Sequence, residues 1–384
     1  MPTVQTYPID YRFYATQDVE GVFTEHEYPI LSDMRDFKIW MMLKLLEDPY
    51  RNYDDLVNTF TDGFYGSAGT YIRDYLQKLT VAASAKNIYL GMNASPQHYR
   101  YLDLDFILSA QAIFDAAEKA VVRKPVFLRR VRHARLPLDR ATVLFYPRLM
   151  REWVVFRGHS PKSMPLQRDA IAQRYRETWL IQADMRFPVN LRKAEKNTAD
   201  EEITTLTALK MHVFRSPKVY ILPATVVTDY TANMMRNYRN ISKVVPDPDA
   251  ESGITNRLQL PPDIDSANHP LVKYRLPMPW GIYDQDNKRV VASKRLKWED
   301  VTGPGYHWYK MGTCPIRRST LLYFFWSWII QVDVDDVADA SKPDEIFDVW
   351  ARIKFEGPAF PHGRKEDRNS ISVERVIITK HNMK

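Results

Sequence analysis

Residues 36–79 read DFKIWMMLKLLEDPYRNYDDLVNTFTDGFYGSAGTYIRDYLQKL, and this stretch decides the fold of the front half of the chain. Its apolar residues recur every three or four positions, which is typical of helices. In the first helix they cover most of the circumference, so we expect this helix to be buried between layers. Pro49 ends it, because the residue before a proline avoids the helical conformation. Gly63 and Gly66 mark the end of a second helix, and a third follows them.

The residues before this stretch show the order helix, strand, helix. Residues 7–18 form the predicted first helix, with Pro8 in its opening turn. Residues 21–24, GVFT, are short, apolar and led by glycine, which is typical of a buried parallel strand. This order is that of a barrel or a doubly wound sheet. One strand cannot form a sheet, so this segment requires neighbours that the chain does not obviously supply.

The middle of the chain, from residue 51 to about residue 187, is predicted to be helical almost throughout. Its clearest stripe begins at Asp105, where apolar residues again recur at helical spacing up to Val121. Further helices are predicted over residues 129–138 and 166–185. Short connections favour antiparallel packing of such helices.

The end of the chain alternates with a period of two. In residues 347–356, FDVWARIKFE, the odd positions are apolar and the even ones are charged, except for Trp350. This pattern predicts strands with one buried and one solvated face. Corners rich in Gly and Pro separate them, which indicates an antiparallel β-sandwich. The fold class is therefore α+β with several domains, and residues 191–260 are the part with the weakest pattern.

The composition of the chain further limits its fold class, its disulfides and its membrane association. A chain of 384 residues with 45% hydrophobic and 26% charged residues is expected to be globular and multidomain. Its single cysteine, Cys314, excludes an intrachain disulfide and is interpreted as structural. The apolar run 321–330 is too short to span a bilayer as a helix, so no membrane span is predicted. We expect an extracellular or periplasmic location if a signal segment precedes Met1, and a cytoplasmic one otherwise.

The formal net charge is +7, and basic residues cluster between Arg123 and Arg140. The common explanation of such a run is a solvated helix face. The alternative is an anionic partner, either acidic polysaccharide or nucleic acid, of which nucleic acid is disfavoured here.

Three segments carry a resemblance to a known family. They are GVFTEHEY at 21–28, the stretch 36–79, and FLRRVRHARLPLD at 127–139. Together they resemble a bacterial domain-of-unknown-function family found in proteins related to alpha-glucuronidase-like and hexosaminidase-like glycoside hydrolases. Phe64 stands where this family usually has tyrosine. The segments 306–312, 324–334, 347–363 and 370–380 resemble the galactose-binding-like jelly roll that closes many such proteins.

The resemblance implies a division of the chain into four parts. Residues 1–50 would be the last helix, strand and helix of a (β/α)8 barrel, residues 51–190 an α-helical domain, residues 191–260 a linker and irregular segment, and residues 261–384 a carbohydrate-binding-like sandwich. Barrel catalytic carboxylates come mainly from strands that are absent here. The chain is therefore expected to be the C-terminal portion of a glycoside hydrolase-like protein, with an oligo- or polysaccharide partner and no assigned catalytic residue.

Four residues are candidates for contacting the saccharide. Glu25, His26 and Glu27 follow the predicted strand at the end where barrels keep their active sites. Trp350 interrupts the charged face of its strand, and an exposed aromatic ring can stack on a sugar ring. The alternatives are a solvated loop for the first three and a covering loop for Trp350. Trp40 is expected to pack in the core instead.

No metal or cofactor site is predicted. Asp333, Asp335, Asp336 and Asp344 could offer oxygen ligands to a structural calcium ion, but they lack EF-hand spacing, and a solvated turn is the favoured interpretation. The sequence also lacks the zinc-helix, phosphate-loop and nucleophile-elbow motifs.

Overall fold

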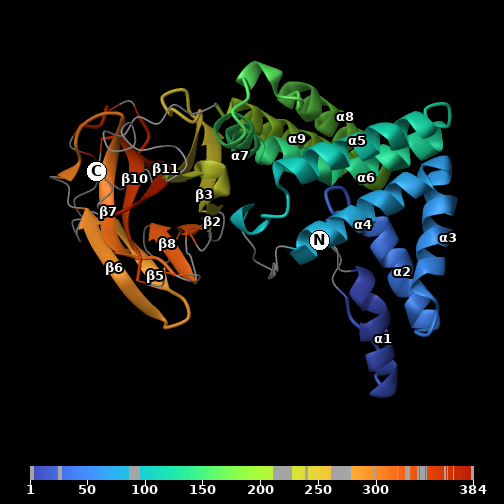
Figure 1. Cartoon of the computed structure of the whole chain (residues 1–384). Helices are drawn as coiled ribbons and strands as arrows, with labels where there is room; N and C mark the ends of the chain where they lie inside the picture. Colours follow the sequence, from blue (N-terminus) through green and yellow to red (C-terminus); the bar gives the residue numbers. More distant parts are fainter. Residues whose placement is uncertain are drawn as a thin grey trace. The chain divides into compact units, whose positions relative to one another are not determined.

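The computed structural model is an α+β protein whose helices precede its strands along the chain (Figure 1). Two compact units are present. The helical unit comprises Met1–Ile88, Arg100–Trp153 and His159–Ile203, and the two-sheet unit comprises Tyr89–Tyr99, Val154–Gly158 and Thr204–Lys384. The structure describes residues 4–24, 28–85, 96–210, 227–237, 241–260, 278–296, 300–317, 319–324, 329–334, 337, 342, 344–358, 360, 362–365 and 367–381.

The helical unit confirms the helices predicted for residues 36–79. Its helices are α1 (Tyr7–Thr16), α2 (Arg35–Glu47), α3 (Tyr53–Tyr65), α4 (Gly69–Ala85), α5 (Leu104–Ala120), α6 (Pro125–Leu144), α7 (Tyr146–Arg151) and α8 (Arg168–Arg186), and α9 (Val189–Ala208) begins within it. Asn52 caps α3, because its side chain accepts a hydrogen bond of 3.1 Å from the Asp55 amide. Helices α2, α3 and α4 lie side by side, as Figure 1 shows.

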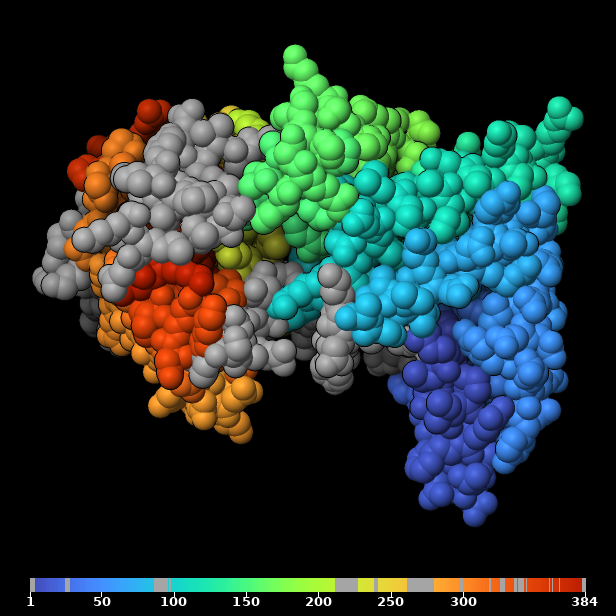
Figure 2. All heavy atoms as spheres, in the orientation of Figure 1, coloured from blue at the N-terminus to red at the C-terminus, as the bar shows by residue number. Residues whose placement is uncertain are grey.

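Two expectations about the front of the chain are wrong. Residues 21–24 form no strand, and Phe23 is 86% exposed. No described strand lies beside this segment to satisfy its backbone groups, so it stays irregular. Helix α2 is also not buried all round, since Leu43 and Leu46 are half-exposed. Helix α1 forms a projection of the helical unit in Figure 2, with Ile9 70% exposed.

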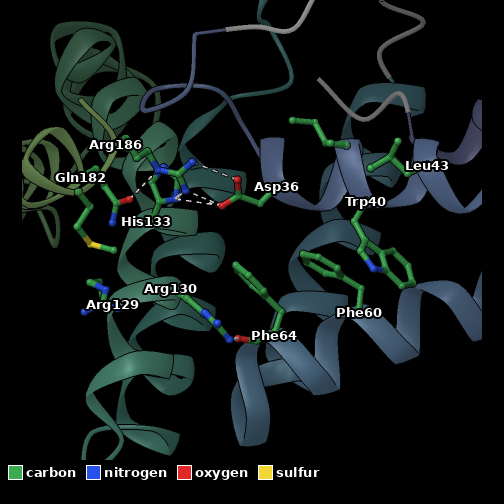
Figure 3. Close-up of a pocket in the computed structure, with 12 residues that line it drawn as sticks. Asp36, Trp40, Leu43, Phe60, Phe64, Arg129, Arg130, His133, Gln182 and Arg186 are labelled. Atoms are coloured by element: carbon green, nitrogen blue, oxygen red, sulfur yellow. Dashed lines mark hydrogen bonds and ion pairs between the residues drawn. The ribbon is translucent and has the colours of Figure 1, made fainter. Parts of the chain in front are cut away.

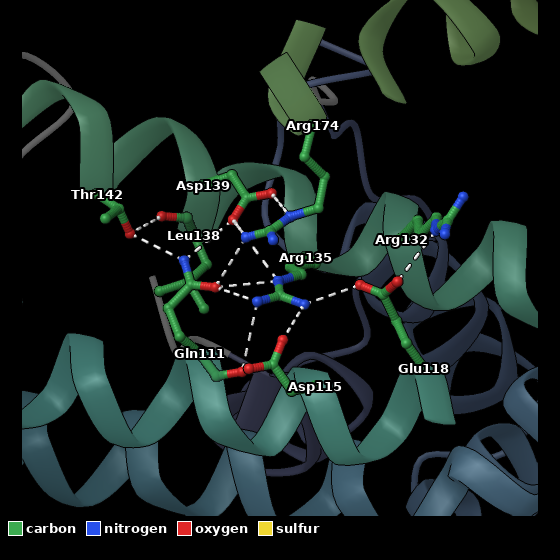
Figure 4. Close-up of polar contacts among 9 residues, drawn as sticks. All are labelled: Gln111, Asp115, Glu118, Arg132, Arg135, Leu138, Asp139, Thr142 and Arg174. Atoms are coloured by element: carbon green, nitrogen blue, oxygen red, sulfur yellow. Dashed lines mark hydrogen bonds and ion pairs between the residues drawn. The ribbon is translucent and has the colours of Figure 1, made fainter. Parts of the chain in front are cut away.

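A buried polar network joins α5, α6 and α8 (Figure 4). The Asp139 carboxylate accepts hydrogen bonds from Arg174 Nε at 2.8 Å and Arg174 Nη2 at 2.7 Å, and from Gln111 Nε2 at 3.0 Å. Arg135 donates to Gln111 and lies 2.9 Å from Glu118 Oε1. Since Asp139 and Arg135 are both buried, each charge depends on its partners.

The two-sheet unit contains two antiparallel sheets. The strands are β1 (Val227–Thr231), β2 (Arg236–Asn237), β3 (Ser242–Pro246), β4 (Ile254–Gln259), β5 (Met278–Asp284), β6 (Arg289–Leu296), β7 (Tyr306–Pro315), β8 (Thr320–Phe324), β9 (Ile330–Asp333), β10 (Ile346–Glu356) and β11 (Ser370–Lys380). One sheet has the order β3-β4-β11-β10-β7, with β1 also paired to β11, and the other has the order β2-β9-β8-β5-β6. Residues 191–260, predicted to be a linker and irregular, thus contain β1 to β4 and most of α9.

One hydrophobic cluster is shared by both sheets. It includes Trp280 of β5, Phe324 of β8, Val349 and Ile353 of β10 and Val376 of β11. The odd residues of 347–355 are therefore buried, as their alternation predicts. Cys314 joins the same cluster, and burial raises the pKa of its thiol to about 12, which agrees with a structural role.

The charged face of β10, which the sequence predicts to be solvated, is instead largely buried. Asp348 and Lys354 are only 1% and 3% exposed. Lys310 Nζ and His381 Nδ1 lie 2.7 and 3.1 Å from the Asp348 carboxylate, and Asp247 lies 2.8 Å from Lys354 Nζ. Alternation in the sequence identified the two faces of the strand, but it could not show that ion pairs cover the charged one.

A β-bulge concentrates further charge in this unit. The register of β10 and β11 shifts between Arg352 and Ile353, which leaves Glu374 as the extra residue beside Arg375. Both are fully buried. Glu374 accepts a hydrogen bond of 2.7 Å from the Ser252 amide, and Arg375 Nη2 lies 2.8 Å from Asp229.

Among the described helices, none is long and apolar enough to cross a membrane.

Replacing Asp139 by alanine should destabilise the helical unit by about 1–3 kcal/mol, because the buried amide of Gln111 and the guanidinium of Arg174 lose the carboxylate to which both donate. Urea unfolding followed by far-UV circular dichroism measures this change. The exposed helical acid Glu177 provides the control, and Glu177→Ala should shift stability by only about 0.5 kcal/mol. Equal effects of the two substitutions would show that the network contributes little.

The substitution Asp348→Asn should destabilise the two-sheet unit at pH 7 and progressively less in acid. Burial alone raises the pKa of Asp348, but hydrogen bonds from Lys310, Thr313 and His381 hold this pKa well below its ordinary value. The stabilisation from the folded carboxylate is thus present above the unfolded pKa, about 3.9, and is lost as the pH falls below it. Urea titrations at pH 7, 5 and 3, monitored by NMR signals of β10, test this. A pH-independent difference from wild type would contradict it, and Asp286→Asn is the exposed control.

Candidate functional site

The helical unit contains a pocket of about 550 Å³ between α2, α3, α6 and α8 (Figure 3). This volume lies in the range of small-molecule sites. The residues that line it come from four separate parts of the sequence. They are Asp36, Ile39, Trp40, Leu43, Phe60, Phe64, Arg129, Arg130, His133, Gln182, Met185 and Arg186.

One wall of the pocket is aromatic. Trp40 on α2 and Phe64 on α3 are half-buried, and both pack on the buried ring of Phe60. The ring centroids of Trp40 and Phe60 are 5.4 Å apart, and those of Phe60 and Phe64 are 4.8 Å apart in a stacked arrangement. Trp40 thus contacts the core at Phe60, but it is half-buried and borders the pocket, whereas the sequence predicted a position within the core. The half-exposed Leu43 lies one turn further along the same side of α2.

The opposite wall is polar and built around one carboxylate. Asp36 Oδ1 and Oδ2 accept hydrogen bonds from Arg186 Nη1 at 3.2 Å and Nη2 at 2.7 Å. This bidentate ion pair joins the start of α2 to the end of α8. Figure 3 shows His133 of α6 beside the pair.

The histidine is held in one tautomer by its surroundings. Its Nε2 lies 3.0 Å from the carbonyl oxygen of Ile30, which can only accept, so Nε2 carries the proton. Its Nδ1 then accepts from Arg186 Nη2 at 3.3 Å. Burial lowers the pKa of His133, and the Arg186 guanidinium lowers it further, against the opposing effect of Asp36. His133 is therefore neutral at pH 7.

The two remaining arginines of the pocket differ in what they contact. Arg130 donates to the carbonyl oxygen of Phe64 at 3.0 Å, and its guanidinium carbon lies 4.2 Å from the centroid of the Phe64 ring. Arg129 is half-buried, and no described residue forms a hydrogen bond or ion pair with its guanidinium. Arg129 is thus the lining cation that remains available to a ligand.

The basic run between Arg123 and Arg140 is not a simple solvated face. Glu118 lies 3.0 Å from Arg132 Nε and 2.9 Å from Arg135 Nη1. Glu202 lies 2.7 Å from Arg140 Nε. Much of the positive charge is therefore neutralised within the helical unit, and the prediction of a solvated face is wrong for Arg135, which is buried.

The predicted saccharide-contacting residues are not brought together in this pocket. Glu25, His26 and Glu27 lie outside the described residues. Trp350 is in β10 of the two-sheet unit, half-buried, with Lys310 Nζ 5.8 Å from the centroid of its ring. Of the proposed calcium ligands, Asp335 and Asp336 also lie outside the described residues, and Asp333 pairs with Arg236 at 3.2 Å. Within the described ranges, no cluster of His, Cys, Asp or Glu could hold a metal ion.

Comparison with protein families gives a match for the front of the chain. Residues 1–77 match the model of a family described as Domain of unknown function (DUF4838). This supports the predicted relation to a domain-of-unknown-function family over those residues. Comparisons with curated proteins and with solved structures give no match. The matched residues include the α2 and α3 side of the pocket, with Asp36, Trp40, Phe60 and Phe64.

Replacing Asp36 by asparagine should lower the pKa of His133 further, because Asp36 favours the imidazolium and Arg186 opposes it. NMR titration of the imidazole nitrogens, assigned with His133→Gln, measures this pKa in both proteins. The control is Asp55→Asn, which changes an exposed acid outside the pocket. A rise in the His133 pKa in Asp36→Asn would refute the assigned arrangement.

Proposed function

We propose that the chain is the non-catalytic, saccharide-binding C-terminal portion of a carbohydrate-processing protein, and that the pocket of the helical unit is its saccharide site. The observation that carries this proposal is the pairing of the aromatic wall, Trp40 and Phe64, with a polar wall across a pocket of ligand size. Sugar rings combine an apolar face with a rim of hydroxyl groups, and such a pocket meets both requirements.

The small number of acidic residues in the pocket favours a role in binding over one in hydrolysis. Glycoside hydrolysis commonly uses two carboxylates that flank the bond to be broken. Among the described residues that line the pocket, Asp36 alone is acidic, and both of its oxygens are occupied by Arg186. Asp36 is thus suited to fixing the polar wall rather than to proton transfer.

The same proposal covers the remaining parts of the chain. Helices α1 and α2 would be the last helices of a glycosidase-like barrel, and the exposed ring of Phe23 between them is one that neighbouring strands would cover. The two-sheet unit would be a galactose-binding-like jelly roll with Trp350 as a second sugar contact. Its support is the half-buried ring of Trp350 beside the Lys310 ammonium group.

Binding of nucleic acid along the basic run is the weaker candidate. A phosphate backbone requires several open cations in a row. Arg132, Arg135 and Arg140 are instead engaged by Glu118 and Glu202. An anionic group on a smaller ligand remains compatible with Arg129.

Removal of the aromatic wall should weaken saccharide binding. Trp40→Ala is expected to lower oligosaccharide affinity by at least about tenfold, by analogy with the roughly 1–3 kcal/mol that a nucleobase gains by stacking on an aromatic side chain. Isothermal titration calorimetry with a panel of neutral and acidic oligosaccharides measures the change. The matched control is Leu46→Ala, a half-exposed residue of α2 outside the pocket. Unchanged affinity in folded Trp40→Ala would exclude this pocket as the site.

A further inference from the structure

We propose that the saccharide bound in this pocket is acidic, and that Arg129 binds its carboxylate or sulfate group. This inference rests on the proposed saccharide-binding function and deepens it by naming the class of ligand. It comes from the unequal engagement of the three arginines that line the pocket.

Two of the three guanidinium groups are already engaged. Arg186 gives two hydrogen bonds to Asp36 and is neutralised by that carboxylate. Arg130 is held by the carbonyl oxygen of Phe64 and lies over the Phe64 ring. Each of these contacts fixes the direction of a side chain. Neither group can turn to a ligand without giving up a contact.

Arg129 has none of these constraints. It is half-buried and has no acidic partner among the described residues, although several of its neighbours on α6 do. Keeping a cation partly out of water beside apolar side chains costs free energy unless an anion pairs with it. A carboxylate or sulfate oxygen pair matches the planar fork of a guanidinium and forms two parallel hydrogen bonds.

The positions of the anion site and the stacking site suggest how the ligand lies. Figure 3 shows Arg129 on α6 across the pocket from Trp40 on α2. A ligand that contacts both side chains would stack a sugar ring on Trp40 and direct its acidic group to Arg129.

Asp36 sets the charge that the pocket accepts. Because Asp36 neutralises Arg186 and His133 is neutral, Arg129 and Arg130 are the uncompensated charges, and Arg130 is fixed against Phe64. The site is therefore matched to one anionic group per ligand. Asp36 is a positioning residue in this scheme, since it acts through Arg186.

The test compares ligands that differ in charge alone. The probes are a disaccharide with one hexuronic acid unit, the same disaccharide with its carboxyl group reduced to an alcohol, and the reduced disaccharide carrying one sulfate group. The full chain should bind both acidic probes about tenfold or more tightly than the neutral one. Arg129→Gln should abolish this preference. Arg123→Gln removes the same charge from an exposed position outside the pocket and should retain the preference.

The outcomes separate the two proposals. Equal binding of neutral and acidic probes, unchanged by Arg129→Gln, would overturn the acidic ligand and leave the saccharide site in place. Failure of every probe to bind the wild-type chain would overturn both. A preference for one acidic probe over the other distinguishes carboxylate from sulfate.

A second variant tests the role of Asp36. Asp36→Asn should release Arg186 and increase affinity for a doubly sulfated disaccharide relative to the singly sulfated one by about tenfold. Circular dichroism confirms that the variant folds. An unchanged ratio of the two affinities in the folded variant would exclude charge control by Asp36.

Discussion

The bidentate ion pair between Asp36 and Arg186 is the contact on which the pocket depends. It joins residues 150 positions apart and fixes the beginning of α2 against the end of α8. Both side chains are about one quarter exposed, so the net gain in stability is modest. Its importance is geometric. With Arg186 held, His133 of α6 keeps one tautomer, and the polar wall faces the aromatic wall in a fixed arrangement.

Ion pairing also organises other parts of the chain that the structure describes, where several buried charges are met by partners of opposite charge. In the helical unit, Asp139 is surrounded by Arg174, Arg135 and Gln111. In the two-sheet unit, the bulge at Glu374 brings this acid and Arg375 into one buried cluster. Such clusters tolerate loss of a partner poorly, since the remaining charge cannot return to water. The guanidinium of Arg129 differs from these groups, because it has no ion-pair or hydrogen-bond partner among the described residues.

The sequence predicted local structure better than it predicted the site. Helical spacing identified α2, α3 and α4, because apolar periodicity depends on each helix alone. The strand at residues 21–24 failed because a strand requires partners that its own sequence does not contain. The pocket was missed for a related reason. Trp40 and Phe64 lie in the stretch that decided the fold, but their meeting with Arg129 and Arg186 depends on tertiary packing. The basic run between Arg123 and Arg140 was the feature of the sequence that could have indicated the pocket. It did not show which of its arginines lacks an acidic partner among the described residues.

The division of the pocket between two parts of the chain bears on its specificity. The family match over residues 1–77 includes the aromatic wall and Asp36, whereas Arg129, His133 and Arg186 lie beyond it. Stacking on an aromatic ring tolerates many sugars, because each pyranose has an apolar face. A guanidinium selects by charge and by the position of an anionic group. In the proposed function, the matched residues supply the contact with the sugar ring, and α6 and α8 supply the choice among sugars. Changes confined to those two helices could alter the ligand while the aromatic wall stays the same.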